Sequence, residues 1–353
     1  MRKKNVRNER VKREYFIKLK EANGLTLATI MQVERAIRMY EEFSDYEDFD
    51  RFKNVKALEF KKWLKARHIG RGCISLSMYC YQLKSLKKYF TWLAGQPGYR
   101  RKLRQDWADF FNPSNKEDRI ASQPAVSQYP DWAHVRKLIN SIKGQTEIDR
   151  RDRALISFMI LSGMRVQSIL SLPVKCFDVH TLTVYQSPRD DVKTKFSKTI
   201  WTILMVFNKN LVKHLKAWVE YLKSVGYGDD DPLFPGNKLE HCANGISFIP
   251  ATKVSNNNWE NAESFRDVLR KRSEAGGLPY FPPHGYRHLA VFLALKAAKN
   301  GEQLKAISQN FGHEFVATTL QVYGNLDVNR LRKVIAKVDF IKALEEDDED
   351  SNF

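Results

Sequence analysis

The sequence predicts a mainly α-helical protein with one small β-sheet (an α+β fold), divided into a helical N-terminal domain and a larger second domain. Apolar residues recur every three or four positions over most of the chain, which is the period of amphipathic helices. β-branched and aromatic residues concentrate within 181–205. A stretch rich in proline and serine, 112–131, interrupts the helical period and is the expected linker. At 353 residues, the chain is also long for one domain.

The composition indicates a polyanionic partner. The chain carries 59 Lys and Arg against 41 Asp and Glu, a formal net charge of +18. We expect DNA rather than a membrane, because no apolar stretch approaches the length of a bilayer span. The basic N-terminus lacks the apolar core of a signal peptide, so we expect a cytoplasmic, nucleoid-associated protein.

Neither a metal nor a nucleotide cofactor is expected. The cysteines show no Cys-x-x-Cys spacing, which argues against a zinc site. A phosphate-binding loop of the G-x-x-x-x-G-K-[ST] type does not occur either. The four cysteines are Cys73, Cys80, Cys176 and Cys242.

The N-terminal part begins with a basic segment, 1–24, which is either a solvated helix or an arm that contacts phosphates. The helical domain 25–111 follows, with runs at 26–43, 54–67 and 75–93. In the last run one apolar stripe recurs at steps of three and four. A basic face beside such a stripe is usually only solvated, but in a chain this basic it is a candidate DNA contact. The residues of that face are Lys84, Lys87 and Lys88.

The second domain, 132–327, is expected to begin with two helices, at 132–142 and 152–161. The segments 181–185 and 199–205 then predict a hairpin or small sheet around a polar stretch. Two lysines, Lys193 and Lys195, precede the second strand, and a shift of one residue in register would exchange their faces. The loop 236–263 is either a specificity loop or a neutral insertion.

A cluster of polar residues follows near the end of this domain. His284 and Arg287 are three apart at the start of a helical run, so they share one face. Gly312-His313 separates two further runs, and Tyr323 comes ten residues after His313. Far upstream, Arg165 follows Gly163, where the buried run that ends at Leu161 is expected to stop. No acidic residue is close to this arginine in sequence, so an external anion is its natural partner.

This order and spacing of residues resembles the tyrosine recombinases, the lambda-integrase family that includes phage integrases and Xer-like enzymes. The resemblance is specific from Ala154 to Tyr323 and looser before it. It implies a helical core-binding domain for 25–111 and a tyrosine-recombinase catalytic domain for 132–327. One position departs from the pattern: three residues after Arg165 the family commonly has an acidic residue that supports the arginine, and this chain has Ser168.

The resemblance assigns a role to each polar residue. Arg165, Arg287 and His313 would hold the non-bridging phosphate oxygens, which suits the planar fork of arginine. Tyr323 would attack the phosphorus to form a 3′-phosphotyrosyl intermediate, and His284 would move a proton. The segment Lys193-Thr194-Lys195-Phe196-Ser197 resembles the family's lysine segment, with Lys193 as the donor of a proton to the leaving 5′ oxygen and Lys195 as the alternative.

The last part of the chain predicts assembly. An apolar stripe within 328–345 indicates a C-terminal helix, which either packs on its own domain or is exchanged between protomers, as in the family. The tail 346–353 is acidic. Strand exchange between two duplexes, through a Holliday junction, would require a homotetramer on double-stranded DNA with a specific recombination site, together with any accessory DNA-bending or directionality proteins.

The sequence leaves three hypotheses about the function. A site-specific DNA recombinase that integrates, excises or transposes a mobile element agrees best with the separate helical domain and the helix after the tyrosine. A type IB topoisomerase-like enzyme would share the Arg, Lys, His and Tyr chemistry. A catalytically inactive DNA-binding protein would have lost at least one of these residues, whereas all are present. The target DNA sequence is not predicted.

Overall fold

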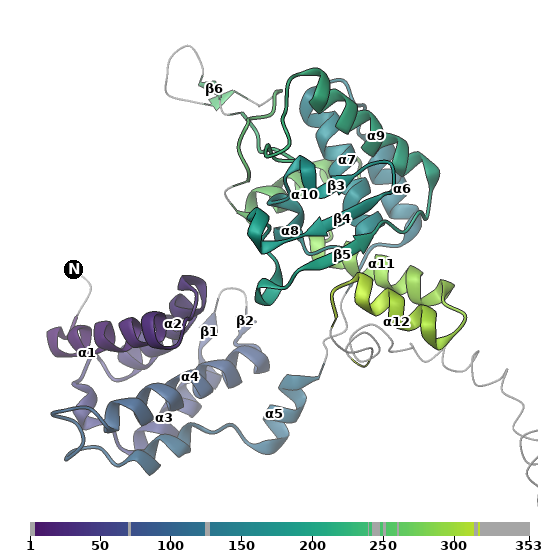
Figure 1. The fold of residues 1–353 in the computed structure, drawn as a ribbon. Coiled ribbons are helices and arrows are strands. Elements are labelled where there is room, and N and C mark those ends of the chain that lie inside the picture. Colours follow the sequence, from purple (N-terminus) through teal and green to yellow (C-terminus); the bar gives the residue numbers. More distant parts are fainter. Residues whose placement is uncertain are drawn as a thin grey trace, which may run out of the picture. The chain divides into compact units, whose positions relative to one another are not determined.

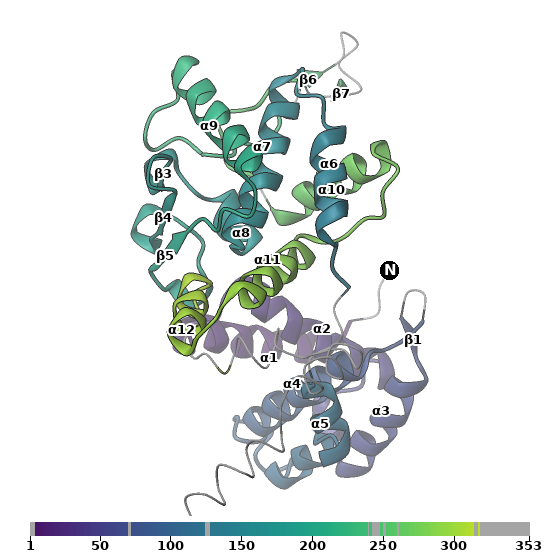
Figure 2. The ribbon, with the colours of Figure 1, turned by 90° about the vertical axis from the view of Figure 1, so that its right-hand side faces the viewer.

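The computed structural model describes residues 4–69, 72–123, 128–238, 240–241, 248–249, 252–259, 261–313 and 317. The chain divides into two compact units, Met1–Pro124 and Ala125–Phe353 (Figures 1 and 2). The division falls inside the range 112–131 that the sequence assigns to a linker. Tyr323, the expected helix 328–345 and the tail 346–353 lie outside the described residues. Within the described part, no helix has both the length and the apolarity needed to span a bilayer.

The N-terminal unit is a helical domain with one short hairpin. The basic segment 1–24 is not separate from it, because Val11, Tyr15 and Leu19 are buried in the domain's core. That core is also rich in aromatic rings, and Phe52 stacks on Phe90 with ring centroids 4.0 Å apart. Its α-helices and strands are α1 (Val6–Ile17), α2 (Leu27–Phe43), α3 (Asn54–Ala66), β1 (His68–Ile69), β2 (Gly72–Cys73), α4 (Leu76–Ala94) and α5 (Asn115–Ser122).

Helix α5 occupies part of the expected linker range. A capping box starts it: the Ser114 hydroxyl accepts from the Glu117 N–H, and the Glu117 carboxylate accepts from the Ser114 N–H. The helix is fixed to the rest of the unit by an ion pair from Lys84 to Asp118, and by the Ser77 hydroxyl, which donates to the Ala121 carbonyl. Local capping therefore outweighs the Pro and Ser signals on which the linker prediction depended.

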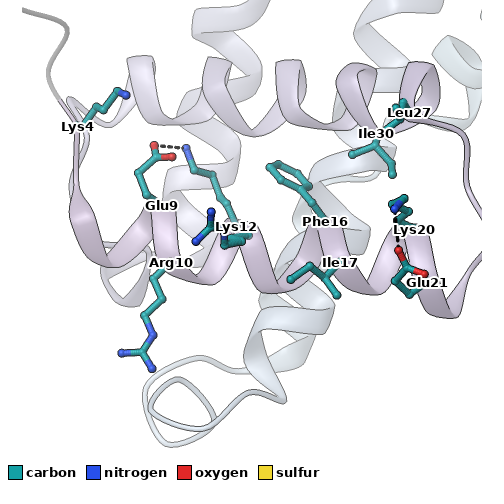
Figure 3. Close-up of a pocket in the computed structure, with 11 residues that line it drawn as sticks. Lys4, Glu9, Arg10, Lys12, Phe16, Ile17, Lys20, Glu21, Leu27 and Ile30 are labelled. Carbon is teal, nitrogen blue, oxygen red and sulfur yellow. Dashed lines mark hydrogen bonds and ion pairs between the residues drawn. The ribbon is translucent and has the colours of Figure 1, made fainter.

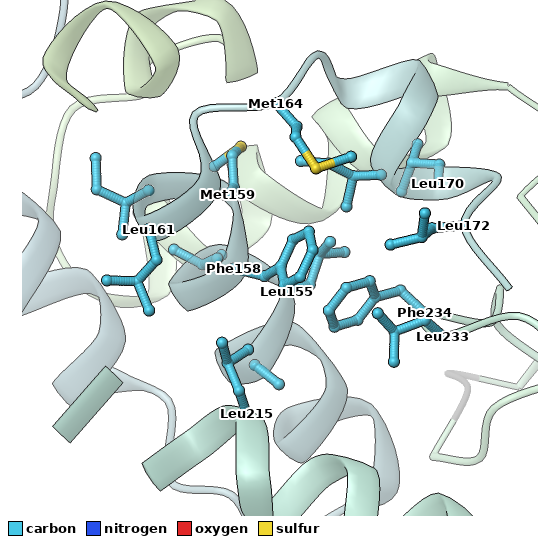
Figure 4. Close-up of a cluster of buried hydrophobic side chains, with 14 of the residues drawn as sticks. Leu155, Phe158, Met159, Leu161, Met164, Leu170, Leu172, Leu215, Leu233 and Phe234 are labelled. Atoms are coloured by element: carbon cyan, nitrogen blue, oxygen red, sulfur yellow. The ribbon is translucent and has the colours of Figure 1, made fainter. Parts of the chain in front are cut away.

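The second unit is built around helix α7. Its Leu155 and Phe158 are fully buried and pack against Leu215 and Phe234 from later segments (Figure 4). The α-helices and strands of this unit are α6 (Trp132–Ser141), α7 (Glu147–Ser162), α8 (Val166–Leu170), β3 (Phe177–Asp178), β4 (Thr183–Gln186), β5 (Ile200–Ile203), α9 (Lys209–Ser224), β6 (Glu240–His241), β7 (Phe248–Ile249), α10 (Ala262–Ala275), α11 (Pro283–Ala297) and α12 (Gly301–Asn310).

The predicted hairpin is present as β4 and β5, which pair antiparallel with Thr183 opposite Ile203 and Gln186 opposite Ile200. A third strand, β3, pairs with β4 and has only two residues, too few to show a period in the sequence. The predicted fold class, mainly α with a small sheet, is confirmed. Lys193 and Lys195 lie in the connection between β4 and β5 and not in a strand, so strand register does not decide which of them faces the site.

Candidate active site

The turn between α7 and α8 places Arg165. Helix α7 ends at Gly163 in the left-handed conformation, with φ 58°, and the Gly163 N–H donates to the Met159 carbonyl at 3.0 Å. A Cβ atom at this position would lie 2.2 Å from Cε1 of Phe311, so only glycine lets the two segments approach this closely. Arg165 is the N-cap residue of α8. The expected helix stop at Gly163 is therefore also a packing contact with the end of α12.

Arg287 lies on the first turn and a half of α11 and is only 2% exposed. Its Nη1 donates to the Gly163 carbonyl at 2.6 Å, and its Nη2 donates to the Phe311 carbonyl at 3.0 Å. Its guanidinium carbon lies 5.4 Å from the centroid of the Phe311 ring. Two backbone carbonyls far apart in sequence thus fix the orientation of the guanidinium, which is the arrangement that a bidentate cation needs.

His313 is held by the same arginine. Nη2 of Arg287 lies 2.9 Å from Nε2 of His313, and since arginine has no acceptor, Nε2 must be the unprotonated nitrogen. Burial lowers the pKa of His313 to about 4, with further lowering by the charges of Arg287, Arg165 and Lys195. Burial, followed by Arg287 and Arg165, also lowers the pKa of His284. Both histidines are therefore neutral at pH 7.

An anchor that sequence reasoning missed holds the His313 turn against the sheet. The Asn310 side chain pairs with Ile203 of β5 as a neighbouring strand would: Oδ1 accepts from the Ile203 N–H at 2.7 Å, and Nδ2 donates to its carbonyl at 3.0 Å. The Thr202 hydroxyl donates to the Asn310 carbonyl at 3.0 Å. Helix α12 lies beside β5 in Figures 1 and 2. An asparagine at a helix end has many ordinary roles, so no sequence signal points to this one.

A cavity of about 520 Å³ brings together most of the predicted residues of this unit that the structure describes; His313 is not among its lining residues and contacts the site through Arg287. Its lining comes from the α7–α8 turn, the β4–β5 connection, α10 and the start of α11. Among the lining residues is Arg266, which the sequence analysis did not select; it is ion-paired with Glu263 on α10. Its i,i+3 partner on a polar helix gave it the pattern of a surface residue. The charged and titratable lining residues are Arg165, Lys193, Lys195, Arg266, His284 and Arg287.

The remaining predicted site residues are Lys84, Lys87 and Lys88 on α4. Lys84 pairs with Asp118 at 2.5 Å, and Lys87 pairs with Asp109 at 2.8 Å. Lys88 is exposed. Part of the positive charge on this face is therefore compensated within the N-terminal unit.

The N-terminal unit contains a larger cavity of about 740 Å³, between α1 and α2 (Figure 3). Its lining is mixed, with apolar Phe16, Ile17 and Ile30 among charged residues. Lys12 there is ion-paired with both Glu9 and Glu41. Because none of the predicted catalytic residues lines this cavity, its size alone does not make it a reaction site.

The Phage integrase family matches residues 131–330 of the chain. Among curated relatives, the tyrosine recombinase XerC of Shigella flexneri serotype 5b (strain 8401) is 21% identical over 325 residues, covering 91% of this chain and 93% of the relative. Tyrosine recombinase XerD of Listeria monocytogenes serotype 4b (strain F2365) is 23% identical over 318 residues, covering 88% and 92%.

The fold also matches a solved structure. The Tn1549 transposon integrase, in complex with transposon right end DNA, is similar with a TM-score of 0.59 at 16% identity, covering 93% of this chain and 99% of that one. The family match spans more than half of the chain and includes every residue that the sequence analysis placed in the reaction. The chain belongs to the phage integrase family and is a tyrosine recombinase.

Proposed function

We propose that the chain recombines DNA at a specific site through a 3′-phosphotyrosyl intermediate, with the residue roles that the family resemblance implies and without a metal or nucleotide cofactor. The observation that carries the proposal is that predicted site residues from separate segments of the chain meet at one cavity. Arg165, Lys193, His284 and Arg287 come from three separate segments and line one cavity, and Arg287 contacts His313 from a fourth. Two guanidinium groups, a lysine and a neutral histidine around one cavity, with a second neutral histidine bonded to Arg287, suit a phosphodiester and its leaving group.

In the cleavage step, Oη of Tyr323 attacks the phosphorus and the bond from phosphorus to the 5′ oxygen breaks. The Tyr323 phenol has an unperturbed pKa of about 10, so it needs a base. His284, neutral at pH 7, accepts its proton. Arg165 and Arg287 hold the non-bridging oxygens, with His313 beside them. The ammonium of Lys193 gives its proton to the 5′ oxygen, which leaves as a hydroxyl. The 5′ hydroxyl of another strand reverses the step and joins new partners.

The proposed substrate is double-stranded DNA that carries a recombination site, bound by four protomers on two duplexes. The charge of +18 supports a DNA partner, and so do the relatives named as recombinases. The fold similarity to a transposon integrase supports a role in moving a mobile element. The apolar stripe within 328–345 is proposed to form a helix that is exchanged between protomers. Lys84, Lys87 and Lys88 are proposed to contact DNA phosphates, and a cytoplasmic, nucleoid-associated location agrees with such a substrate.

A covalent-trapping assay tests the reaction class. End-labelled DNA fragments from both flanks of the gene's own element, intact and nicked near candidate sites, are incubated with wild type, Tyr323→Phe and Tyr221→Phe, and resolved on denaturing gels. Tyr221 is the matched control, because it lies on α9 and stacks on Trp218 outside the cavity. Wild type and Tyr221→Phe are expected to form a protein-linked strand that Tyr323→Phe lacks.

The position of the protein-linked strand then maps the crossover site. The proposal is wrong if wild type binds these fragments yet forms no adduct even on nicked DNA, and the nucleophile is wrongly assigned if Tyr323→Phe forms the adduct as well.

A further inference from the structure

We infer that Ser168 and Ser171 are positioning residues that hold Lys193, and not Lys195, as the proton donor to the leaving 5′ oxygen. The inference rests on the proposed function. It concerns the one position at which the chain departs from the family pattern.

The two hydroxyls hold Lys193 from both sides of its backbone. The Ser168 hydroxyl donates to the Lys193 carbonyl at 2.9 Å, and the Ser171 hydroxyl accepts from the Lys193 N–H at 2.8 Å. Ser171 also donates to the Gln167 carbonyl at 3.0 Å, which fixes the direction in which its oxygen accepts. Ser168 is 2% exposed and Ser171 is 7% exposed, so water competes little for either bond.

The neighbours of Lys193 strengthen this hold. Val192, immediately before it, is buried at 2% exposure. The backbone of Lys193 is therefore fixed by one apolar anchor and two hydrogen bonds, while its side chain is exposed at the cavity. A fixed backbone leaves only the side-chain rotamers to be ordered when DNA binds, which lowers the entropic cost of reaching the 5′ oxygen.

Lys195 lacks a comparable hold. Among the described residues, no side chain is found hydrogen-bonded to the backbone of Lys195, which begins a short 3-10 turn, Lys195–Ser197, where Phe196 and Ser197 have left-handed φ angles of 61° and 50°. Its Nζ lies 4.9 Å from the centroid of the exposed Phe196 ring. Both lysines line the same cavity, so access to the cavity does not distinguish them. What distinguishes them is how firmly side chains hold the backbone of each lysine.

Helix α8 connects Arg165 with the two serines that hold Lys193. Arg165 is the N-cap residue of α8, Ser168 lies within that helix and Ser171 is its C-cap. A single short helix therefore sets the position of the arginine that binds the phosphate and of the lysine that protonates the leaving group. An acidic residue at position 168 could not donate to the Lys193 carbonyl, since an ionised carboxylate is only an acceptor.

The test compares two leaving groups at the crossover site mapped by the trapping assay. One substrate has the natural 5′ oxygen, and the other has sulfur at that bridging position. A thiol has a pKa of about 8.5, far below that of an alcohol, so the thiolate leaves without a proton. A residue that acts only through the proton donor therefore matters for the oxygen substrate and not for the sulfur substrate.

Single-turnover cleavage is measured for wild type, Ser168→Ala, Ser168→Thr, Ser171→Ala, Lys193→Ala, Lys195→Ala and Ser157→Ala. Ser157 is the matched control, a fully buried serine whose hydroxyl donates to the Arg153 carbonyl inside α7. Thermal unfolding of each variant shows whether it folds. General acid catalysis contributes about 10²- to 10⁴-fold, so partial misalignment in Ser168→Ala and Ser171→Ala is expected to slow the oxygen substrate by about 10- to 100-fold.

Three results support the inference together: both serine alanine variants and Lys193→Ala recover near wild-type rates on the sulfur substrate, Ser168→Thr retains most activity on oxygen, and Lys195→Ala shows little defect. Equal slowing of the serine variants on both substrates would mean a merely structural role and overturn the inference. Recovery by sulfur in Lys195→Ala, with none in Lys193→Ala, would overturn it in favour of the other lysine. If wild type forms no adduct with either substrate, the proposed function itself fails.

Discussion

The two halves of the candidate site are built in opposite ways. The half around Arg287 is buried and bonded to backbone: one guanidinium reaches the carbonyls of Gly163 and Phe311 as well as the ring of His313. In the half around Lys193, two serine hydroxyls hold the backbone, but the lysine side chain is exposed on a connection whose residues Phe196 and Ser197 have left-handed φ angles. Groups that stabilise charge on a phosphate gain from burial and preorganisation, whereas a proton donor must reach an atom that arrives with the DNA.

The strongest test of this difference is to replace Arg287, the buried cation. Arg287→Lys keeps the charge but cannot contact both carbonyls and His313, because an ammonium is a compact group without a planar fork. We expect about a 10³-fold loss in single-turnover cleavage and a lower free energy of unfolding, by about 3 kcal/mol, measured by urea denaturation. Arg266→Lys is the matched control at the rim of the same cavity, where the side chain is 43% exposed, and should change cleavage only a few-fold. Equal effects of the two variants would contradict the distinction between the halves.

The second way is to remove each lysine of the exposed half. Lys193→Ala is expected to slow cleavage of natural DNA by about 10²-fold through loss of the proton donor, with little change in the free energy of unfolding, because the side chain is exposed. Lys195→Ala should slow cleavage by less than about 10-fold, mainly through weaker phosphate binding. Single-turnover rates at saturating enzyme separate the two effects. A large stability loss in Lys193→Ala would show that this half is also part of the core.

The third way uses pH. The pKa of His313 is about 4 in the folded chain, below the unfolded value of about 6.5. The unfolded state therefore binds a proton first, so this contribution to stability is complete above about pH 6.5 and is lost progressively as pH falls toward 4. Urea unfolding between pH 7.5 and 4.5 should show this decline, and His313→Gln should make it shallower. An unchanged slope in the variant would mean that His313 is not held neutral by its surroundings.

The smallest effect is expected outside the site, on α4. Removing an exposed phosphate contact should lower the slope of log binding constant against log salt by about 0.9. Lys88→Ala should show this change, whereas Lys84→Ala should show less, because Asp118 already compensates that charge. Filter binding or fluorescence anisotropy at several salt concentrations measures both slopes. Identical slopes in wild type and Lys88→Ala would remove this lysine from the proposed DNA contacts.

The sequence predicted the helical runs that form α2, α3, α4, α6 and α7 and the hairpin of β4 and β5, because helical and strand periods are local signals, and it selected the candidate site residues through the H-x-x-R and G-H motifs. The positions of the helix stop at Gly163 and the hairpin around 181–205 follow from the same kind of signal. What it could not predict depends on contacts between distant segments. The pairing of Asn310 with Ile203, and the bonds from Ser168 and Ser171 to Lys193, join ordinary polar residues whose roles arise only from packing. Helix α5 was missed for another reason: its capping box lies among residues that otherwise indicate a loop.

The contact between Gly163 and Phe311 also has a consequence for synthesis of the chain. Arg165 leaves the ribosome 122 residues before Arg287, and at about 5–20 residues per second that interval is roughly 6–24 s. During this time Phe311, which packs on the turn at Gly163, has not been made. Arg165 therefore has no second guanidinium, that of Arg287, beside it. A nascent chain can therefore begin to fold without being competent to cut DNA, because the proposed phosphate-binding half of the site forms only when the last part of the domain has been made.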